Sequence, residues 1–199
     1  STGARTSLSA LRGKVVVLAD FLTLCGEECP MTSANMNQMA RTASNDGLAG
    51  KVVFVEVTVD PQRDTPARLA AYRKLYGASR NWMLLTTTSS NLKAFCQYFG
   101  VFYKKTKEGN PPDVDWLTHK PLRYDIAHQD AVVFIDKQGH ERFVILGNAN
   151  TEGKSPPRTL SKFLDDEGRK NLNHPGPLSW TVPEGLGVVS WLLGENVKT

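Results

Sequence analysis

An apolar run that leads into two closely spaced cysteines constrains the fold of this chain more than any other feature. Residues 14–22 are rich in β-branched side chains without alternation, which predicts a buried strand. Cys25 and Cys29 follow with three residues between them, and Pro30 suits the first position of a helix. The helix dipole lowers the pKa of a thiol at such a junction, and the three-residue spacing lets both sulfurs face one metal ion. The junction therefore predicts redox or soft-metal chemistry at Cys25 and Cys29.

The rest of the chain alternates between strand and helix patterns. Further strands are predicted at 51–59, 82–86, 123–127, 131–136 and 142–146, and helices at 30–42, 65–77, 89–100 and from Pro157 onward. This order predicts an α/β fold in which helices flank a mixed sheet. We expect the first two strands to be central and parallel, and the last two to extend the sheet as an antiparallel hairpin.

The chain is long enough to bury one substantial core, so we expect a single domain over residues 1–199. Its core is predicted at about 14–168, with an added polar loop at about 104–122 and a Pro/Gly-rich C-terminal extension at 171–199. Residues 185–194 of the extension are uncharged and mostly apolar. Two interpretations stay open: the extension packs back on the domain, or it contacts a partner or a membrane surface.

Charge and composition narrow the classes of partner. The formal net charge is +4, and the one dense basic cluster, residues 104–107, has no aromatic stacking motif beside it, so no nucleic-acid partner is predicted. No stretch approaches the length of an apolar membrane span. Because the chain opens at Ser1 without an initiator Met, we expect a mature or trimmed domain whose targeting segment is not in this sequence.

Three separated blocks together resemble the Sco/SenC family, which are copper-handling, thioredoxin-like proteins involved in cytochrome c oxidase assembly. Residues 21–30 match the family's C-x-x-x-C-P signature after a strand. Residues 57–66 match its T-x-D-P-x-x-D-T-P block, and residues 126–139 match its ligand histidine ahead of a strand and a D-x-x-G turn. The long loop at 104–122, Gln129 after the histidine and the tail beyond Lys170 depart from the family pattern, which leaves the choice of partner less constrained than the fold.

The resemblance implies a thioredoxin-like fold and a site for Cu(I) or Cu(II) whose ligands are Cys25, Cys29 and His128. The implied partner is the copper-bearing subunit of cytochrome c oxidase, with other copper chaperones or thiol reductants as further partners. The implied location is extracytoplasmic, on the bacterial periplasmic or cell-surface side or in the mitochondrial intermembrane space. Membrane tethering would then come from an N-terminal anchor outside this chain. The resemblance also places the loop with Asp60 and Asp64 near the cysteines, where we expect it to dock a partner.

Three functions compete on these residues. The leading hypothesis is a copper chaperone that delivers copper to the dinuclear copper site of cytochrome c oxidase by ligand exchange. The second is a thiol–disulfide oxidoreductase with Cys25 and Cys29 as its catalytic residues, so whether the chain is an enzyme stays open. The third is a peroxiredoxin-like peroxidase, suggested by Thr23 two residues before Cys25. The chain lacks the proline that normally precedes that threonine in such enzymes, and a peroxidase site would give His128 no role.

The remaining candidate ligands have structural interpretations. Cys96 shares a helical face with Leu92, Phe95 and Phe99, which predicts a buried thiol. Glu27 and Glu28 lie between the two cysteines and are expected to raise the thiol pKa. Packing is expected for the helix methionines and surface positions for the other histidines, of which the first is the least secure because its loop could fold over the site: Met31, Met36, Met39, His119, His140 and His174.

Overall fold

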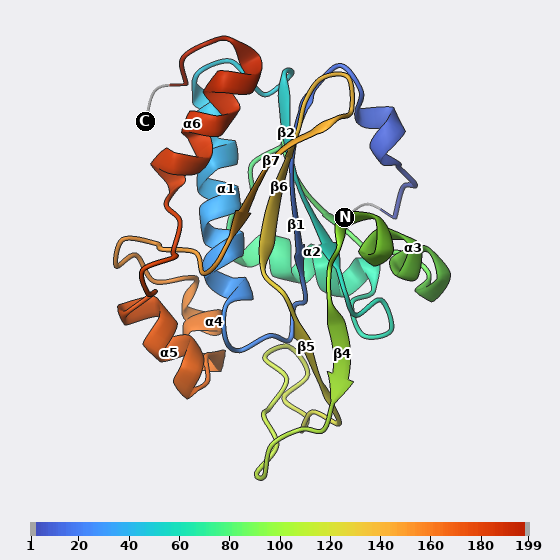
Figure 1. Ribbon diagram of the computed structural model, residues 1–199. Coiled ribbons are helices and arrows are strands. Elements are labelled where there is room, and N and C mark those ends of the chain that lie inside the picture. Colours follow the sequence, from blue (N-terminus) through green and yellow to red (C-terminus); the bar gives the residue numbers. More distant parts are fainter. Residues whose placement is uncertain (1–2, 198–199) are drawn as a thin grey trace.

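The computed structural model describes residues 3–197 and has a central sheet with helices on both faces (Figure 1). Its elements in chain order are a 3-10 helix at Leu8–Leu11, β1 (Val15–Phe21), α1 (Cys29–Asn45), β2 (Val52–Thr58), α2 (Pro66–Leu75), β3 (Trp82–Leu85), α3 (Ser89–Phe99), β4 (Tyr103–Thr106), β5 (Asp125–His128), β6 (Ala131–Ile135), β7 (Glu141–Leu146), α4 (Arg158–Phe163), α5 (Asp166–Asn173) and α6 (Val182–Leu193).

The main sheet has the strand order β3-β2-β1-β6-β7 within the described residues. β1 pairs with β2 in parallel and with β6 in antiparallel orientation, so it lies at the centre of the sheet. β6 and β7 form the antiparallel hairpin. The predicted mixed sheet, its parallel central pair and its terminal hairpin are therefore confirmed.

The sheet buries both faces, which explains the continuous apolar runs of β1 and β2. Alternate residues of β1, such as Val15 and Val17, belong to a core cluster that also contains residues of α1, α2 and α6. Their neighbours Val16 and Leu18 belong to a second cluster, against which Phe95 and Phe99 of α3 pack. All seven residues of β1 are buried in consequence.

The C-terminal extension packs back on the rest of the chain. α6 runs beside α1 (Figure 1), and Leu186 and Val189 of α6 are almost fully buried. A Cβ atom added at Gly185 would lie 2.4 Å from the sulfur of Met39 in α1, so the absence of a side chain permits the close approach of the two helices. Of the two interpretations of the extension, packing against the domain is the one that holds for α6. The division of the chain into a core and an extension of one domain stays a prediction.

Two segments differ from the sequence expectations. The segment 104–122, expected to be a polar loop, begins inside β4, which pairs antiparallel with β5 in a separate two-stranded sheet. Two helices, α4 and α5, lie where the sequence predicted one from Pro157 onward, and the Pro/Gly-rich extension contains a further helix, α6, which Thr181 caps with a reciprocal capping box to Glu184. No helix within residues 3–197 is long and apolar enough to cross a membrane.

Candidate metal centre

Cys25, Cys29 and His128 converge at the end of β1. One ligand atom from each lies within 4.8 Å of the other two. Cys29 opens α1 and is buried, Cys25 lies in the preceding loop and is partly exposed, and His128 ends β5. The Sγ atom of Cys29 and Nε2 of His128 are 3.4 Å apart. The fold therefore brings together three residues separated by up to 103 positions, the set that the family resemblance implied.

The other ring nitrogen of His128 contacts a carboxylate that the sequence analysis did not single out. Nδ1 of His128 lies 2.7 Å from Oδ2 of Asp20, and the two side chains are 5% and 1% exposed. Burial lowers the pKa of His128, but its hydrogen bonds to Asp20 and Cys25 outweigh that effect and raise the pKa well above its ordinary value. The imidazole is thus held between a carboxylate and two thiols.

The two thiols at the site are not equivalent. Hydrogen bonds from Cys29 and His128 hold the pKa of Cys25 well below its ordinary value, although burial opposes them. Burial and the neighbouring Cys25 sulfur raise the pKa of Cys29 well above its ordinary value. Cys25 is therefore the more acidic of the two thiols, and Cys29 is the thiol that donates a hydrogen bond to it.

The two glutamates, expected to raise the thiol pKa, do not determine the direction of the Cys25 shift. Burial raises the pKa of Glu28 to about 9, so this carboxyl is neutral at pH 7 and exerts no charge on the thiol. Burial and the Cys25 thiolate raise the pKa of Glu27 to about 7, which leaves it only partly ionised. The short-range hydrogen bonds to Cys25 decide the direction instead.

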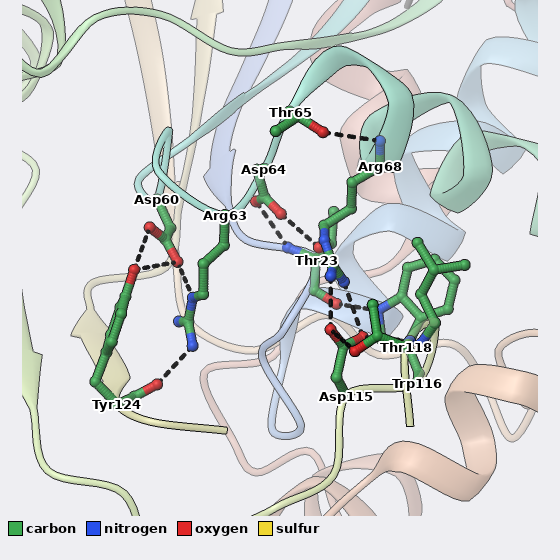
Figure 2. Close-up of polar contacts among 11 residues, drawn as sticks. Thr23, Asp60, Arg63, Asp64, Thr65, Arg68, Asp115, Trp116, Thr118 and Tyr124 are labelled. Atoms are coloured by element: carbon green, nitrogen blue, oxygen red, sulfur yellow. Dashed lines mark hydrogen bonds and ion pairs between the residues drawn. The ribbon is translucent and has the colours of Figure 1, made fainter. Parts of the chain in front are cut away.

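Asp64 holds the loop that carries Cys25 (Figure 2). Its carboxylate accepts hydrogen bonds from the backbone N–H and the hydroxyl of Thr23, and from the hydroxyl of Thr58 in β2. Asp64 precedes Thr65, whose side chain caps α2. The segment just before α2 therefore links the end of β2 to the cysteine loop. The Thr23 hydroxyl donates its proton to Asp64, so in this structure it does not donate a hydrogen bond toward Cys25.

The added loop folds against the same segment from the other side. The indole of Trp116 donates a 2.7 Å hydrogen bond to the carbonyl oxygen of Thr23 and packs 6.0 Å from the ring of Tyr72. Asp115 accepts two hydrogen bonds, of 2.9 and 2.6 Å, from the guanidinium of Arg68 in α2 (Figure 2). That guanidinium holds the pKa of Asp115 well below its usual range despite burial. Trp116 is 8% exposed, so this part of the loop belongs to the core.

Asp60 and Asp64, expected to dock a partner, are 3% and 1% exposed. Asp60 accepts hydrogen bonds from Arg63 and from the hydroxyl of Tyr124, just before β5 (Figure 2). Arg63 in turn donates to the Tyr124 carbonyl and stacks on its ring. Both carboxylates are thus engaged inside their own chain, next to the segments that carry Cys25 and His128. Their docking role stays a prediction.

The other candidate ligands lie where the sequence analysis expected them. Cys96 is 5% exposed and lies in the main core cluster. The three helix methionines are fully buried and pack in the same cluster, and the remaining histidines are exposed: Met31, Met36, Met39, His119, His140 and His174. Although the loop of His119 does fold toward the cysteines, its imidazole is not part of the cluster.

Sequence reasoning missed Asp20 and Trp116. The sequence could have pointed to Asp20, because it is the single charged residue in the strand Val15–Phe21. A lone carboxylate in a buried strand requires a partner. No sequence pattern pointed to Trp116, because its contact with Thr23 depends on how a long irregular loop folds.

Comparisons with known proteins agree with this arrangement. Residues 1–155 match the model of a family described as SCO1/SenC. Protein sco1 of Schizosaccharomyces pombe is 24% identical over 162 residues, which cover 81% of this chain and 56% of that protein. The chain therefore spans little more than half the length of this curated relative.

Solved structures of similar proteins share the fold. Copper-bound ScoI of Arabidopsis thaliana superposes with a TM-score of 0.56 at 23% identity, covering 72% of this chain and 81% of that one. A SCO1/SenC family lipoprotein of Bacillus anthracis superposes with a TM-score of 0.53 at 26% identity, covering 77% and 81%. The thioredoxin-like arrangement expected from the sequence is confirmed.

Proposed function

Because this chain belongs to the SCO1/SenC family, we propose that it binds one copper ion through Cys25, Cys29 and His128 and passes it to the dinuclear copper site of cytochrome c oxidase. The convergence of these three ligand atoms within 4.8 Å carries the proposal. Two thiolates and an imidazole suit Cu(I), a soft ion, and accept Cu(II) when a further ligand is added.

The chemistry of delivery is ligand exchange on the copper cargo. Cys25 is partly exposed and Cys29 is buried, so an acceptor thiolate reaches the copper from the Cys25 side. Cys25 is then the first ligand to be replaced and Cys29 the last. The acceptor in this proposal is the copper-bearing subunit of the oxidase. The location that goes with it is extracytoplasmic, with the domain tethered to a membrane by a segment outside this sequence.

The difference between the two thiols supports a second function, thiol–disulfide exchange. The Cys25 thiolate attacks one sulfur of a partner disulfide, and the other partner sulfur leaves as a thiolate. Cys29 then loses its proton and attacks the Cys25 sulfur, which releases the second partner sulfur. Two electrons pass to the partner, and Cys25 and Cys29 become a disulfide. Both functions need the same sulfurs, so an oxidised chain cannot hold copper through them.

Anaerobic copper titration of the reduced protein tests the ligand set. Wild type should bind one copper ion per chain, and His128→Ala should lose Cu(II) affinity while retaining much of its Cu(I) affinity, because Cu(I) tolerates two-coordinate dithiolate binding. His119→Ala is the matched control, since it removes an exposed imidazole from the neighbouring loop. A Cu(II) charge-transfer spectrum that is lost in His119→Ala and unchanged in His128→Ala would refute the assignment.

A further inference from the structure

Asp20 occupies an unfavourable position that packing alone does not explain. It lies in the central strand β1, between buried apolar neighbours, and is 3% exposed. Its Oδ1 atom is buried without a hydrogen-bond partner in the described part of the chain. Burying a carboxylate is costly unless it is paired, and here one oxygen has no hydrogen-bond partner. The other oxygen, Oδ2, contacts Nδ1 of His128 at 2.7 Å.

This contact determines which nitrogen of His128 faces the cysteines. Nδ1 points to Asp20, and Nε2 lies 3.4 Å from the Sγ atom of Cys29. A carboxylate at Nδ1 favours the tautomer with its proton on that nitrogen, which leaves the Nε2 lone pair available to a metal ion. It also makes the imidazole a stronger donor, because its negative charge stabilises positive charge on the ring.

We propose that Asp20 is a positioning residue for the copper site, which orients His128 and makes it a better ligand for Cu(II) than for Cu(I). The inference rests on the proposed function and adds a selection between the two oxidation states of the cargo. Cu(II) depends on the imidazole, whereas Cu(I) is held by the two thiolates without it. A residue that acts through His128 therefore affects Cu(II) binding and leaves Cu(I) binding largely unchanged.

A purely structural role for Asp20 predicts a different result. Among the described hydrogen bonds, Asp20 serves as acceptor for His128 and for no backbone group. A purely structural role would appear as a lower free energy of unfolding for Asp20→Asn, with the affinities for Cu(II) and Cu(I) unchanged. The two roles are therefore separated by measurements on copper.

The experiment compares Asp20→Asn with wild type and with Asp136→Asn. Asp136 forms the other Asp–His contact of the chain's described part, at 3.5 Å from His140, whose side chain is 73% exposed and outside the site. Chelator competition should show a loss of about 10- to 100-fold in Cu(II) affinity for Asp20→Asn, as for other residues that support a metal-bound histidine. Its Cu(I) affinity should stay within about threefold, and its Cu(II) charge-transfer and EPR spectra should change. Asp136→Asn should match wild type in each copper measurement.

The outcomes separate this inference from the function beneath it. If wild type bound no copper, or if His128→Ala kept the wild-type Cu(II) spectrum, the ligand set itself would fail. If His128→Ala lost Cu(II) while Asp20→Asn kept wild-type affinity and spectrum, the role of Asp20 alone would be overturned.

A second measurement does not depend on the variant folding. Nitrogen-15 NMR of the Cu(I)-loaded wild type, which is diamagnetic, should show His128 with a proton on Nδ1 that exchanges slowly with water. The opposite tautomer, with the proton on Nε2, would overturn the proposal.

Discussion

The indole nitrogen of Trp116 donates a 2.7 Å hydrogen bond to the backbone carbonyl of Thr23, two residues before Cys25. The carboxylate of Asp64 accepts hydrogen bonds from the backbone N–H and the hydroxyl of the same threonine. All three polar groups of Thr23 are therefore hydrogen-bonded, two to the segment just before α2 and one to the added loop. A loop held in this way keeps Cys25 in place without contacting its sulfur.

We predict that Trp116→Phe loosens the cysteine loop. The substitution keeps an aromatic ring against Tyr72 and removes the donor to Thr23, so it should cost about 0.5–1.5 kcal/mol of unfolding free energy. Amide hydrogen exchange should become faster at Thr23–Cys25. Trp191→Phe is the control, because Trp191 is 60% exposed on α6. Equal exchange rates in the two variants would contradict a restraining role for Trp116.

We predict that Cys25 is the reactive thiol of the reduced protein. Because its pKa lies well below the ordinary value, iodoacetamide should modify Cys25 at neutral pH, and the rate should stay high as the pH falls until that lowered pKa is reached. Cys29 and Cys96 should react slowly, since burial raises the pKa of both and limits access. Peptide mass spectrometry after short labelling would identify the modified residue. His128→Ala should shift the Cys25 rate profile to higher pH, and first labelling at Cys29 would contradict the assignment.

We predict that Glu56 makes stability decrease with pH. Its carboxylate is fully buried in β2, where it accepts hydrogen bonds from Ser33 and Trp82, and burial raises its pKa from 4.5 to about 8. A carboxyl with a higher pKa in the folded state stabilises the fold while protonated. That contribution is therefore lost as the pH rises from about 4.5 to about 8, by at most about 1.4 kcal/mol per pH unit.

Urea unfolding at several pH values checks this prediction. Glu56→Gln should reduce the decrease over that pH range relative to wild type, because a neutral amide does not titrate. Glu141→Gln replaces an exposed strand glutamate and should leave the wild-type slope unchanged. A Glu56→Gln profile that runs parallel to wild type would show that the carboxyl does not titrate between these values.

We predict that Cys96 serves packing and not copper binding. Cys96→Ala removes a buried sulfur from the main core cluster and should cost about 1–2 kcal/mol of unfolding free energy. Burial raises the pKa of Cys96 to about 11, so it stays protonated and is a poor ligand at neutral pH. Copper stoichiometry should remain one per chain. A lower stoichiometry in a folded Cys96→Ala protein would reveal a role in the site.

Sequence patterns alone predicted the mixed sheet and the position of the cysteines at a strand–helix junction. Continuous β-branched runs are the expected signature of strands buried on both faces, and β1 and β2 have that character. Pro30 and Thr65 marked the starts of α1 and α2 because the first turn of a helix has local chemical requirements. His128 was assigned to the candidate site from the family resemblance, because spacing along the chain does not relate it to Cys25.

The tertiary structure decided which groups act on the cysteines. Asp20 lies opposite His128, and Trp116 bonds the carbonyl of Thr23, only because β5 and the added loop return to the end of β1. The sequence places Glu27 and Glu28 beside the thiols, but the folded chain buries Glu28, whose pKa rises to about 9, while Cys29 and His128 donate to Cys25. Local patterns determine where strands and helices begin, because those rules concern neighbouring residues. Protonation and ligand orientation depend on contacts across the fold, which no local pattern encodes.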